Sequence, residues 1–188
     1  MEFFKKKSIP ILCIIGAIMA IGFTFLTGLR VEGDYYRGEV LVASISVIGL
    51  IFGKGKLATN FEEVPTYHTG GTISIFALIS FIIMIIGIGM CIISLILNVK
   101  NLDVFSGAVV VVASLLMLLI KVAGTNMENM FGDVQKFSIF FKEYSLGVGT
   151  ILYAIIPTCA FIIGFIIKKI VIINSYKKKK YVSKKRVR

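Results

Sequence analysis

Four long apolar stretches dominate the pattern of hydrophobic and polar positions along the chain. They cover residues 9–29, 73–98, 104–123 and 147–167. Each stretch is long enough to cross a bilayer as a helix, which takes about 20 residues. Pro157 lies inside the fourth stretch, and a membrane helix tolerates it because neighbouring groups satisfy the freed backbone. The pattern predicts an all-α membrane fold, a four-helix transmembrane bundle that forms one tetraspan domain over residues 1–188.

The first stretch follows "MEFFKKK", a good n-region for a signal peptide. The apolar run behind it is too long for the apolar region of a signal peptide, and no small-residue cleavage site ends it. Cys13 follows the lysines too closely to be a lipoprotein site. We therefore expect an uncleaved first span.

A fifth, shorter apolar run, "EVLVASISVIGLIFG", covers residues 39–53. As a helix it would be about 21 Å long, whereas the hydrocarbon core is about 30 Å thick, so we do not expect it to cross. Its valines, isoleucines and flanking glycines favour one or two strands packed on the outer ends of the helices. Periodicity alone leaves a short helix open. The first outer loop, 30–72, is thus predicted to hold a small extracellular β or mixed element.

The second outer loop, 124–146, carries aromatic and apolar residues at helical spacing. They are Phe131, Val134, Phe137, Phe141 and Tyr144. This spacing fits a short amphipathic helix lying at the outer surface, or equally an extended extramembrane segment of the fourth helix. By contrast, the connection "VKNLD" between the second and third spans is very short, so we expect those two helices to be antiparallel neighbours.

Composition supports the membrane assignment. The 188 residues are 57% hydrophobic and 16% charged, and the mean hydropathy is +0.92. A soluble domain averages about 45–50% apolar and about 25% charged residues. The chain therefore belongs to the class of integral membrane proteins.

Charge predicts the orientation. With four spans, both termini share one side, which holds 14 of the 21 basic residues, while the outer loops hold 6 basic and 8 acidic residues. Lysine and arginine prefer the cytoplasmic side. We therefore expect a multi-pass protein of the cell membrane with cytoplasmic N- and C-termini, and we do not interpret the net charge of +11 as a sign of DNA binding.

The basic cytoplasmic tail, 168–188, ends in "KKKKYVSKKRVR". Near an anionic bilayer each such residue contributes about 1 kcal/mol of attraction, so the expected partners of the tail are anionic lipids. Docking to RNA, a ribosome or an acidic partner is the alternative. No aromatic platform or nucleic-acid fold accompanies the tail, so nucleic acid is not an expected partner.

The fourth span begins within "KEYSLGVGTILYAIIPTCAFIIG", with Leu146-Gly147 and then Leu152-Tyr153, and the first outer loop contains Gly49-Leu50. These residues and the four-span layout resemble the claudin and peripheral-myelin-protein tetraspan architecture. Ile51 stands where that family has Trp, and the family's pair of loop cysteines is missing. The chain also resembles small four-span proteins of AT-rich Gram-positive bacteria, which lack an assigned activity and often end the first-loop apolar run on Phe-Gly, here Phe52-Gly53. The resemblance implies the architecture and little about function.

Candidate chemistry is sparse. Lys121 is the only charge clearly inside a span, where an ionisable group is by default a functional hypothesis. It lies near the outer end of its helix, so its side chain either snorkels to water or serves as a functional counter-charge. The three cysteines, Cys13, Cys91 and Cys159, fall within spans and are expected to be small buried hydrophobes.

The other chemistry-bearing residues give no site. His68 follows Glu62 and Glu63, and a single histidine in a loop is more often solvated than a ligand. No nucleotide-binding loop and no paired intramembrane carboxylates are present. We therefore predict no catalytic, cofactor-binding or metal-binding residue, no cofactor and no enzymatic activity.

Small residues at helical spacing predict close helix packing. The pairs are Gly16 with Ala20, Ala154 with Thr158, and Ala160 with Gly164, and Gly87 and Gly89 form a similar smooth patch. These surfaces serve packing within the bundle or contacts with another membrane protein or a second copy. The expected function is an accessory, assembly or scaffold component of a membrane complex. The alternative is a subunit of an oligomeric small-solute transporter or channel, for which Ser80, Pro157 and Thr158 are the available mid-depth residues.

Overall fold

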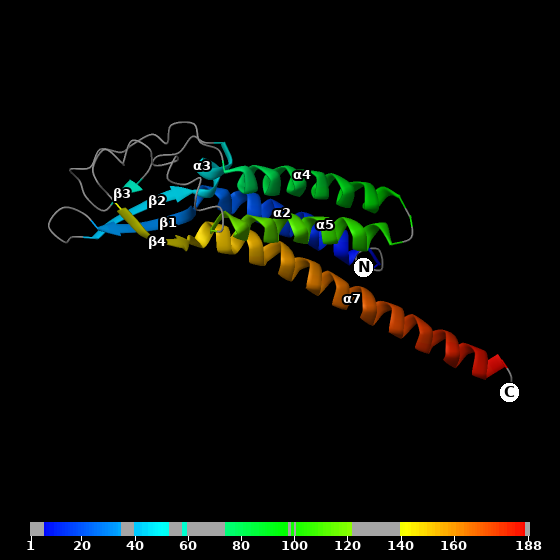
Figure 1. Cartoon of the computed structure of the whole chain (residues 1–188). Coiled ribbons are helices and arrows are strands. Elements are labelled where there is room, and N and C mark those ends of the chain that lie inside the picture. Colours follow the sequence, from blue (N-terminus) through cyan, green and yellow to red (C-terminus); the bar gives the residue numbers. More distant parts are fainter. Residues whose placement is uncertain are drawn as a thin grey trace.

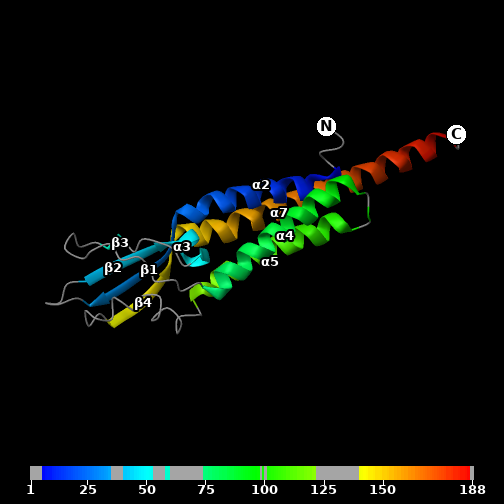
Figure 2. The ribbon, with the colours of Figure 1, turned by 90° about the horizontal axis from the view of Figure 1, so that it is seen from above.

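Four long helices lie side by side, and a small antiparallel sheet extends from one end of them (Figure 1). A view at right angles shows the same arrangement (Figure 2). The computed structural model describes residues 6–34, 40–52, 58–59, 74–97, 99, 101–121 and 140–186. The end of the bundle that meets the sheet is called the sheet end below. The opposite end, where Lys7, Leu97, Asp103 and Lys168 lie, is called the lysine end.

The four long helices are α2 (Ser8–Gly22), α4 (Ile75–Ile96), α5 (Leu102–Leu116) and α7 (Val148–Arg186). Two 3₁₀ turns, η1 (Phe23–Phe25) and η2 (Met117–Lys121), continue α2 and α5 at the sheet end. Four segments are long and apolar enough to cross a membrane: Ser8–Phe25, Ile75–Ile96, Leu102–Ile120 and Val148–Asn174. This confirms the prediction of four apolar helices, as in a multi-pass membrane protein.

The first helix ends earlier than the hydropathy pattern predicts. After Gly22 the chain makes one 3₁₀ turn, in which the Leu26 amide donates to the Phe23 carbonyl at 3.0 Å, and the backbone then becomes extended. Residues 27–29 therefore begin a strand, and the predicted span 9–29 is wrong at its end. The reason is that Leu29 is completely buried where the strand meets the bundle, so the apolar pattern continues after the helix has ended.

The fourth helix is longer than predicted. It begins at Val148, close to the predicted start of the span, but continues through the predicted tail to Arg186. Its 39 residues make a helix about 58 Å long at 1.5 Å per residue. Pro157 lies inside it and is buried. The basic segment is thus a continuation of the membrane helix rather than a separate element.

The sheet has the strand order β3-β2-β1-β4, and every pair is antiparallel. Its strands are β1 (Thr27–Asp34), β2 (Val40–Ser46), β3 (Ala58–Thr59) and β4 (Phe140–Leu146). β1 lies between β2 and β4, with Arg30 opposite Ser44 on one side and Ser145 on the other. Segments more than 100 residues apart therefore share one sheet.

The short apolar run at 39–53 forms both a strand and a short helix, the two structures that its pattern left open. Val40–Ser46 is strand β2, as predicted, and Val47–Phe52 is the short helix α3. α3 is placed by backbone bonds on both sides: the Val47 amide donates to the Leu26 carbonyl at 3.1 Å, and the Ser74 amide donates to the Leu50 carbonyl at 2.9 Å. The run packs at the sheet end and does not form a fifth long helix.

The second predicted outer loop contains a strand where helix was expected. Residues 140–146 form β4, so Phe141 and Tyr144 lie on a strand, and neither helical alternative is correct there. Pairing with β1 supplies the hydrogen bonds that decide the structure, and this partner is far away in sequence. The rest of that predicted helix, including Phe131, Val134 and Phe137, lies outside the described residues.

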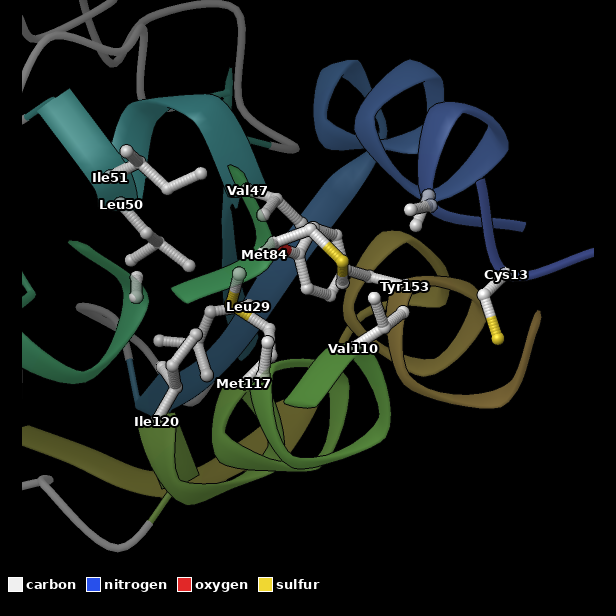
Figure 3. Packing of buried hydrophobic residues seen from close by; sticks show 14 of the residues in the cluster. Cys13, Leu29, Val47, Leu50, Ile51, Met84, Val110, Met117, Ile120 and Tyr153 are labelled. Carbon is white, nitrogen blue, oxygen red and sulfur yellow. The ribbon is translucent and has the colours of Figure 1, made fainter. Parts of the chain in front are cut away.

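Buried apolar side chains form one cluster that runs from the bundle into the junction with the sheet (Figure 3). Tyr153 of α7 is completely buried there, in the same cluster as Met84 of α4 and Val110 of α5. Leu29 of β1 and Leu50 of α3 extend the cluster to the sheet end. α4 and α5 are antiparallel neighbours joined by a short connection, as predicted (Figure 1).

Candidate functional site

At the sheet end, α7 and β1 approach each other through glycine. The Gly147 amide donates to the Gly28 carbonyl at 2.9 Å, and the Thr150 hydroxyl donates to the same oxygen at 2.7 Å. A Cβ added to Gly147 would lie 2.2 Å from the Thr27 carbonyl oxygen, so no larger residue fits without backbone movement. Since β4 runs directly into α7, this contact fixes the sheet to the bundle.

The small residues singled out in the sequence pack helices within the bundle. A Cβ on Gly16 would lie 2.8 Å from the Ala160 Cβ, and one on Gly164 would lie 2.8 Å from the Ile9 Cα, so these glycines form the seam between α2 and α7. Gly87 meets Val110 in the same way between α4 and α5. Gly89 differs, because nothing lies within 4 Å of an added Cβ there.

Hydroxyl groups in the middle of the bundle are bonded to backbone carbonyls. Ser80 of α4 donates to the Ala113 carbonyl of α5 at 2.7 Å, and Thr158 of α7 donates to the Ala154 carbonyl at 2.8 Å. The Ser114 hydroxyl is 3.3 Å from that of Thr158. The mid-depth groups considered for a transport path are therefore packing groups in this structure.

Two cationic side chains hold helix ends together at the lysine end. The Lys7 ammonium donates to the Ser94 carbonyl at 2.6 Å and to the Leu97 carbonyl at 3.2 Å, at the C-terminal end of α4. A cation at this position is stabilised by the helix dipole. Near the same end, the Ser8 hydroxyl donates to the Gly164 carbonyl at 2.8 Å and joins α2 to α7.

The second cationic contact is an ion pair between Lys168 of α7 and Asp103 of α5. Asp103 lies in the first turn of α5, where a carboxylate is favoured by the dipole, and its Oδ1 atom accepts from the Val104 amide at 3.0 Å. The Lys168 side chain is 25% exposed and the Asp103 side chain 10%. Next to it, the Lys169 ammonium lies 5.0 Å from the centre of the Phe165 ring.

Sequence reasoning placed Lys7 and Lys168 in a basic cluster and gave no role to Asp103. A local signal was present, because an acidic residue just before an apolar helical run marks a helix start. What the sequence could not supply was the partner, since Lys168 is 65 residues away. The lysine end is therefore a set of specific contacts as well as a region of positive charge.

The cysteines divide into two classes. Cys13 of α2 and Cys91 of α4 are completely buried and belong to the same apolar cluster. Cys159 is exposed on α7. Among the described residues, no group of three or more His, Cys, Asp or Glu side chains could hold a metal ion.

The remaining residues of interest from the sequence are less informative. Lys121 is the last residue of η2, at the sheet end of α5, but its side chain is not among those that the structure describes. His68, Glu62 and Glu63 lie outside the described residues. The choice between a snorkelling Lys121 and a functional counter-charge stays a matter for experiment.

Comparison with known proteins gives no family assignment. No protein-family model matches the chain, and no curated protein matches it. Function is therefore inferred from the two ends of the bundle and from the surface between them.

Proposed function

We propose that this chain is a non-enzymatic protein of the cell membrane that serves as an accessory, assembly or scaffold component of a membrane complex. The observation that carries the proposal is the rigid attachment of the sheet to the bundle. The sheet is continuous with α2 through β1 and with α7 through β4, and the Gly147–Gly28 contact joins the two connections. A sheet held in this way presents a fixed surface to a partner.

The surface of the bundle supports insertion in lipid. α4 turns small or polar residues inward, among them Ala77, Ser80 and Gly87, and large isoleucines outward. Ile82, Ile85 and Ile86 are between 48% and 54% exposed. In water such an apolar surface would be unfavourable, whereas in lipid it is the expected outer face, with small residues at helix contacts.

The distribution of charge supports an orientation in which the lysine end is cytoplasmic. Lys7, Lys168 and Lys169 lie at that end, and α7 continues from it into the basic segment. Basic residues are retained on the cytoplasmic side during insertion. The sheet is then extracellular, both termini are cytoplasmic, and the extension of α7 lies where anionic lipid headgroups attract it.

The sheet also supports the proposed likeness to the claudin and peripheral-myelin-protein architecture. The likeness rests partly on a first outer loop with strand character, which the residues of the run 39–53 predicted, and β2 lies in that run. Fold-level likeness gives architecture and not activity. The assembly role therefore depends on the attached sheet rather than on the likeness.

No comparable structural observation supports the alternative role in transport. A transport path needs polar groups or broken helices at mid-depth, and the hydroxyls of Ser80 and Thr158 donate to backbone carbonyls instead. An oligomer could build a path between copies. Solute flux in liposomes that contain only this protein would favour that alternative.

The assembly role can be tested by site-specific photo-crosslinking in native membranes. A photoreactive amino acid placed at Ser145, an exposed position of β4, should give one discrete protein adduct that mass spectrometry identifies repeatedly as the same membrane protein. The matched control is Ile86, which is exposed on α4 and should give mainly lipid adducts. Absence of any protein adduct from Ser145, together with a monomer after gentle extraction, would argue against the proposal.

A further inference from the structure

The short helix α3 has no polar side chain and packs beside the start of α4 (Figure 1). Val47, Leu50 and Ile51 of α3 are at most 1% exposed and belong to the apolar cluster (Figure 3). Phe52, the last residue of α3, differs because it is 48% exposed. The helix therefore packs one side against the protein core and ends in a large apolar side chain on the surface.

The Phe52 side chain lies at a level that α4 has already reached inside the bundle. Its ring meets the Phe81 ring edge to face, with 5.8 Å between the ring centres. Phe81 comes six residues after the start of α4 at Ile75, which is about 9 Å along the helix. The 22 residues of α4 make a helix about 33 Å long, close to the thickness of the hydrocarbon core of a bilayer. Phe81 and the Phe52 ring beside it therefore lie below the level at which α4 enters the hydrocarbon.

Backbone groups near both ends of α3 bond to the protein. The Val47 amide donates to the Leu26 carbonyl at 3.1 Å, and the Leu50 carbonyl accepts from the Ser74 amide at 2.9 Å. On an aqueous surface, water can satisfy the end groups of a helix. In lipid no such partner exists, so these groups must be satisfied within the protein. The bonding of α3 thus suits a segment that enters lipid.

The exposed apolar surface continues from Phe52 onto α4. Phe52 touches Phe81, and Ile85, one turn further along α4, is 49% exposed. Ile85 belongs to the outer face of α4 that the proposed function places in lipid. A phenylalanine ring also lacks the polar group with which tyrosine or tryptophan contacts water. We propose that α3 is a re-entrant helix that dips into the leaflet at the sheet end and holds Phe52 among lipid acyl chains.

This lipid contact has a consequence for the sheet. β2 leads directly into α3, with Ser46 the last residue of the strand and Val47 the first of the helix. The insertion of α3 therefore holds β2 at the membrane surface. The chain enters and leaves the leaflet on one side, as expected for a run too short to cross. The inference rests on the membrane insertion of the bundle, which is part of the proposed function, and not on the assembly role.

The test uses fluorescence, because the chain contains no tryptophan and a single substituted tryptophan reports its own surroundings. The full chain with Phe52→Trp is reconstituted in phosphatidylcholine liposomes whose acyl chains carry bromine, a contact quencher, either near the headgroup or near the methyl end. An interfacial helix is buried about 5–10 Å into the boundary between headgroups and acyl chains, so Phe52→Trp should lose about half of its emission or more to the shallow bromine. The deep bromine should quench it less.

Two matched variants calibrate the measurement. Ile86→Trp, on the exposed face of α4 and about 16 Å along the helix from Ile75, should be quenched more by the deep bromine. Ser145→Trp, at an exposed position of β4, should be quenched by acrylamide in the water and not by bromine. If Ile86→Trp is not quenched by bromine, the membrane insertion itself is wrong. If Ile86→Trp is quenched and Phe52→Trp is not, only the inference about α3 fails.

The other possible surroundings of Phe52 give different results. Quenching of Phe52→Trp by acrylamide alone would place the side chain in water. Quenching by neither agent would mean that protein covers it, such as a second copy of the chain, and either result overturns the inference. Ile48→Trp is a second reporter if Phe52→Trp does not fold. Ile48 is partly exposed and lies one turn before Phe52 on α3, so it should also be quenched more by the shallow bromine than by the deep one.

Discussion

Lys168 of α7 forms an ion pair with Asp103 in the first turn of α5. The contact joins the fourth helix to the third at the lysine end, 65 residues apart in sequence. Asp103 also accepts a hydrogen bond from the Val104 amide, so its carboxylate is held by its own helix while it pairs with another. This makes the ion pair a connection between helices rather than a chance meeting of surface charges.

Removing either partner of this ion pair should destabilise the bundle. We expect Asp103→Asn and Lys168→Met each to lower the free energy of unfolding by about 1–3 kcal/mol, less than the loss of a fully buried pair because Lys168 is 25% exposed. The double variant should cost less than the sum of the two single changes. Unfolding by SDS titration in mixed micelles, followed by circular dichroism, measures all three.

The control for this prediction is Lys169→Met. Lys169 is exposed and lies over the Phe165 ring, so its replacement should cost under about 1 kcal/mol. If Lys168→Met is no more destabilising than Lys169→Met, the ion pair contributes nothing measurable to stability.

A side chain at residue 147 should loosen the sheet from the bundle. Gly147→Ala places a Cβ 2.2 Å from the Thr27 carbonyl oxygen, and such overpacking typically costs about 1–3 kcal/mol or more. Gly89→Ala is the matched change, because nothing lies within 4 Å of its added Cβ. Thermal unfolding in detergent should show a lower midpoint for Gly147→Ala only, and equal midpoints would contradict the close contact.

The orientation of the sheet can be measured by labelling. Cysteines placed at Glu39 and Gly55, which flank the β2 and α3 segment, should both react with a membrane-impermeant maleimide added to intact cells. The native cysteines lie within the spans, and labelling of the wild-type protein measures the background reaction from them. Labelling of only one of the two positions would mean that the segment between them crosses the membrane, and the four-span topology would then be wrong.

Lys121→Leu should leave folding intact. A lysine near a helix end extends its ammonium to water and needs no protein partner. Expression level and the detergent melting point should match those of wild type. A marked loss of either would instead indicate a buried polar contact made by Lys121.

Deleting residues 177–188 should preserve folding and topology, because Lys5–Lys7 and Lys168–Lys169 still mark the cytoplasmic side. Binding to anionic liposomes should weaken, and the remaining attraction should act within a Debye length of about 8 Å at physiological salt. A charge-preserving shuffle that moves Tyr176 and Tyr181 separates lipid from protein partners. If the shuffle loses a co-purifying protein while lipid binding stays unchanged, the tail recognises that protein by sequence.

Hydropathy was sufficient to predict the four long helices, because each needs only a local run of apolar residues. It failed at residues 27–29, where a buried strand has the same composition as a membrane helix. It also failed at β4, since Phe141 and Tyr144 fit a helix by spacing and become a strand only by pairing with β1. Local patterns carry no information about such distant partners.

The contacts at the lysine end could not be predicted from local sequence patterns either. Lys7 and Lys168 were recognisable as part of a basic cluster, but their acceptors on α4 and α5 depend on how the helices are rotated in the bundle. Cys13 and Cys91 are similar, since 78 positions separate two residues that are buried in one cluster. The rotation of a helix depends on small residues such as Gly16 and Gly164, which allow close contact between α2 and α7. The sequence does not say which helix each of them will contact.

The continuous helix from Val148 to Arg186 also connects the sheet end of the molecule directly to its basic segment. β4 leads into it through a single residue, Gly147, which is fixed against β1. No loop intervenes along its length of about 58 Å to absorb a rotation or a tilt. The sheet at one end of the molecule and the basic segment at the other are therefore joined by one uninterrupted helix (Figure 1).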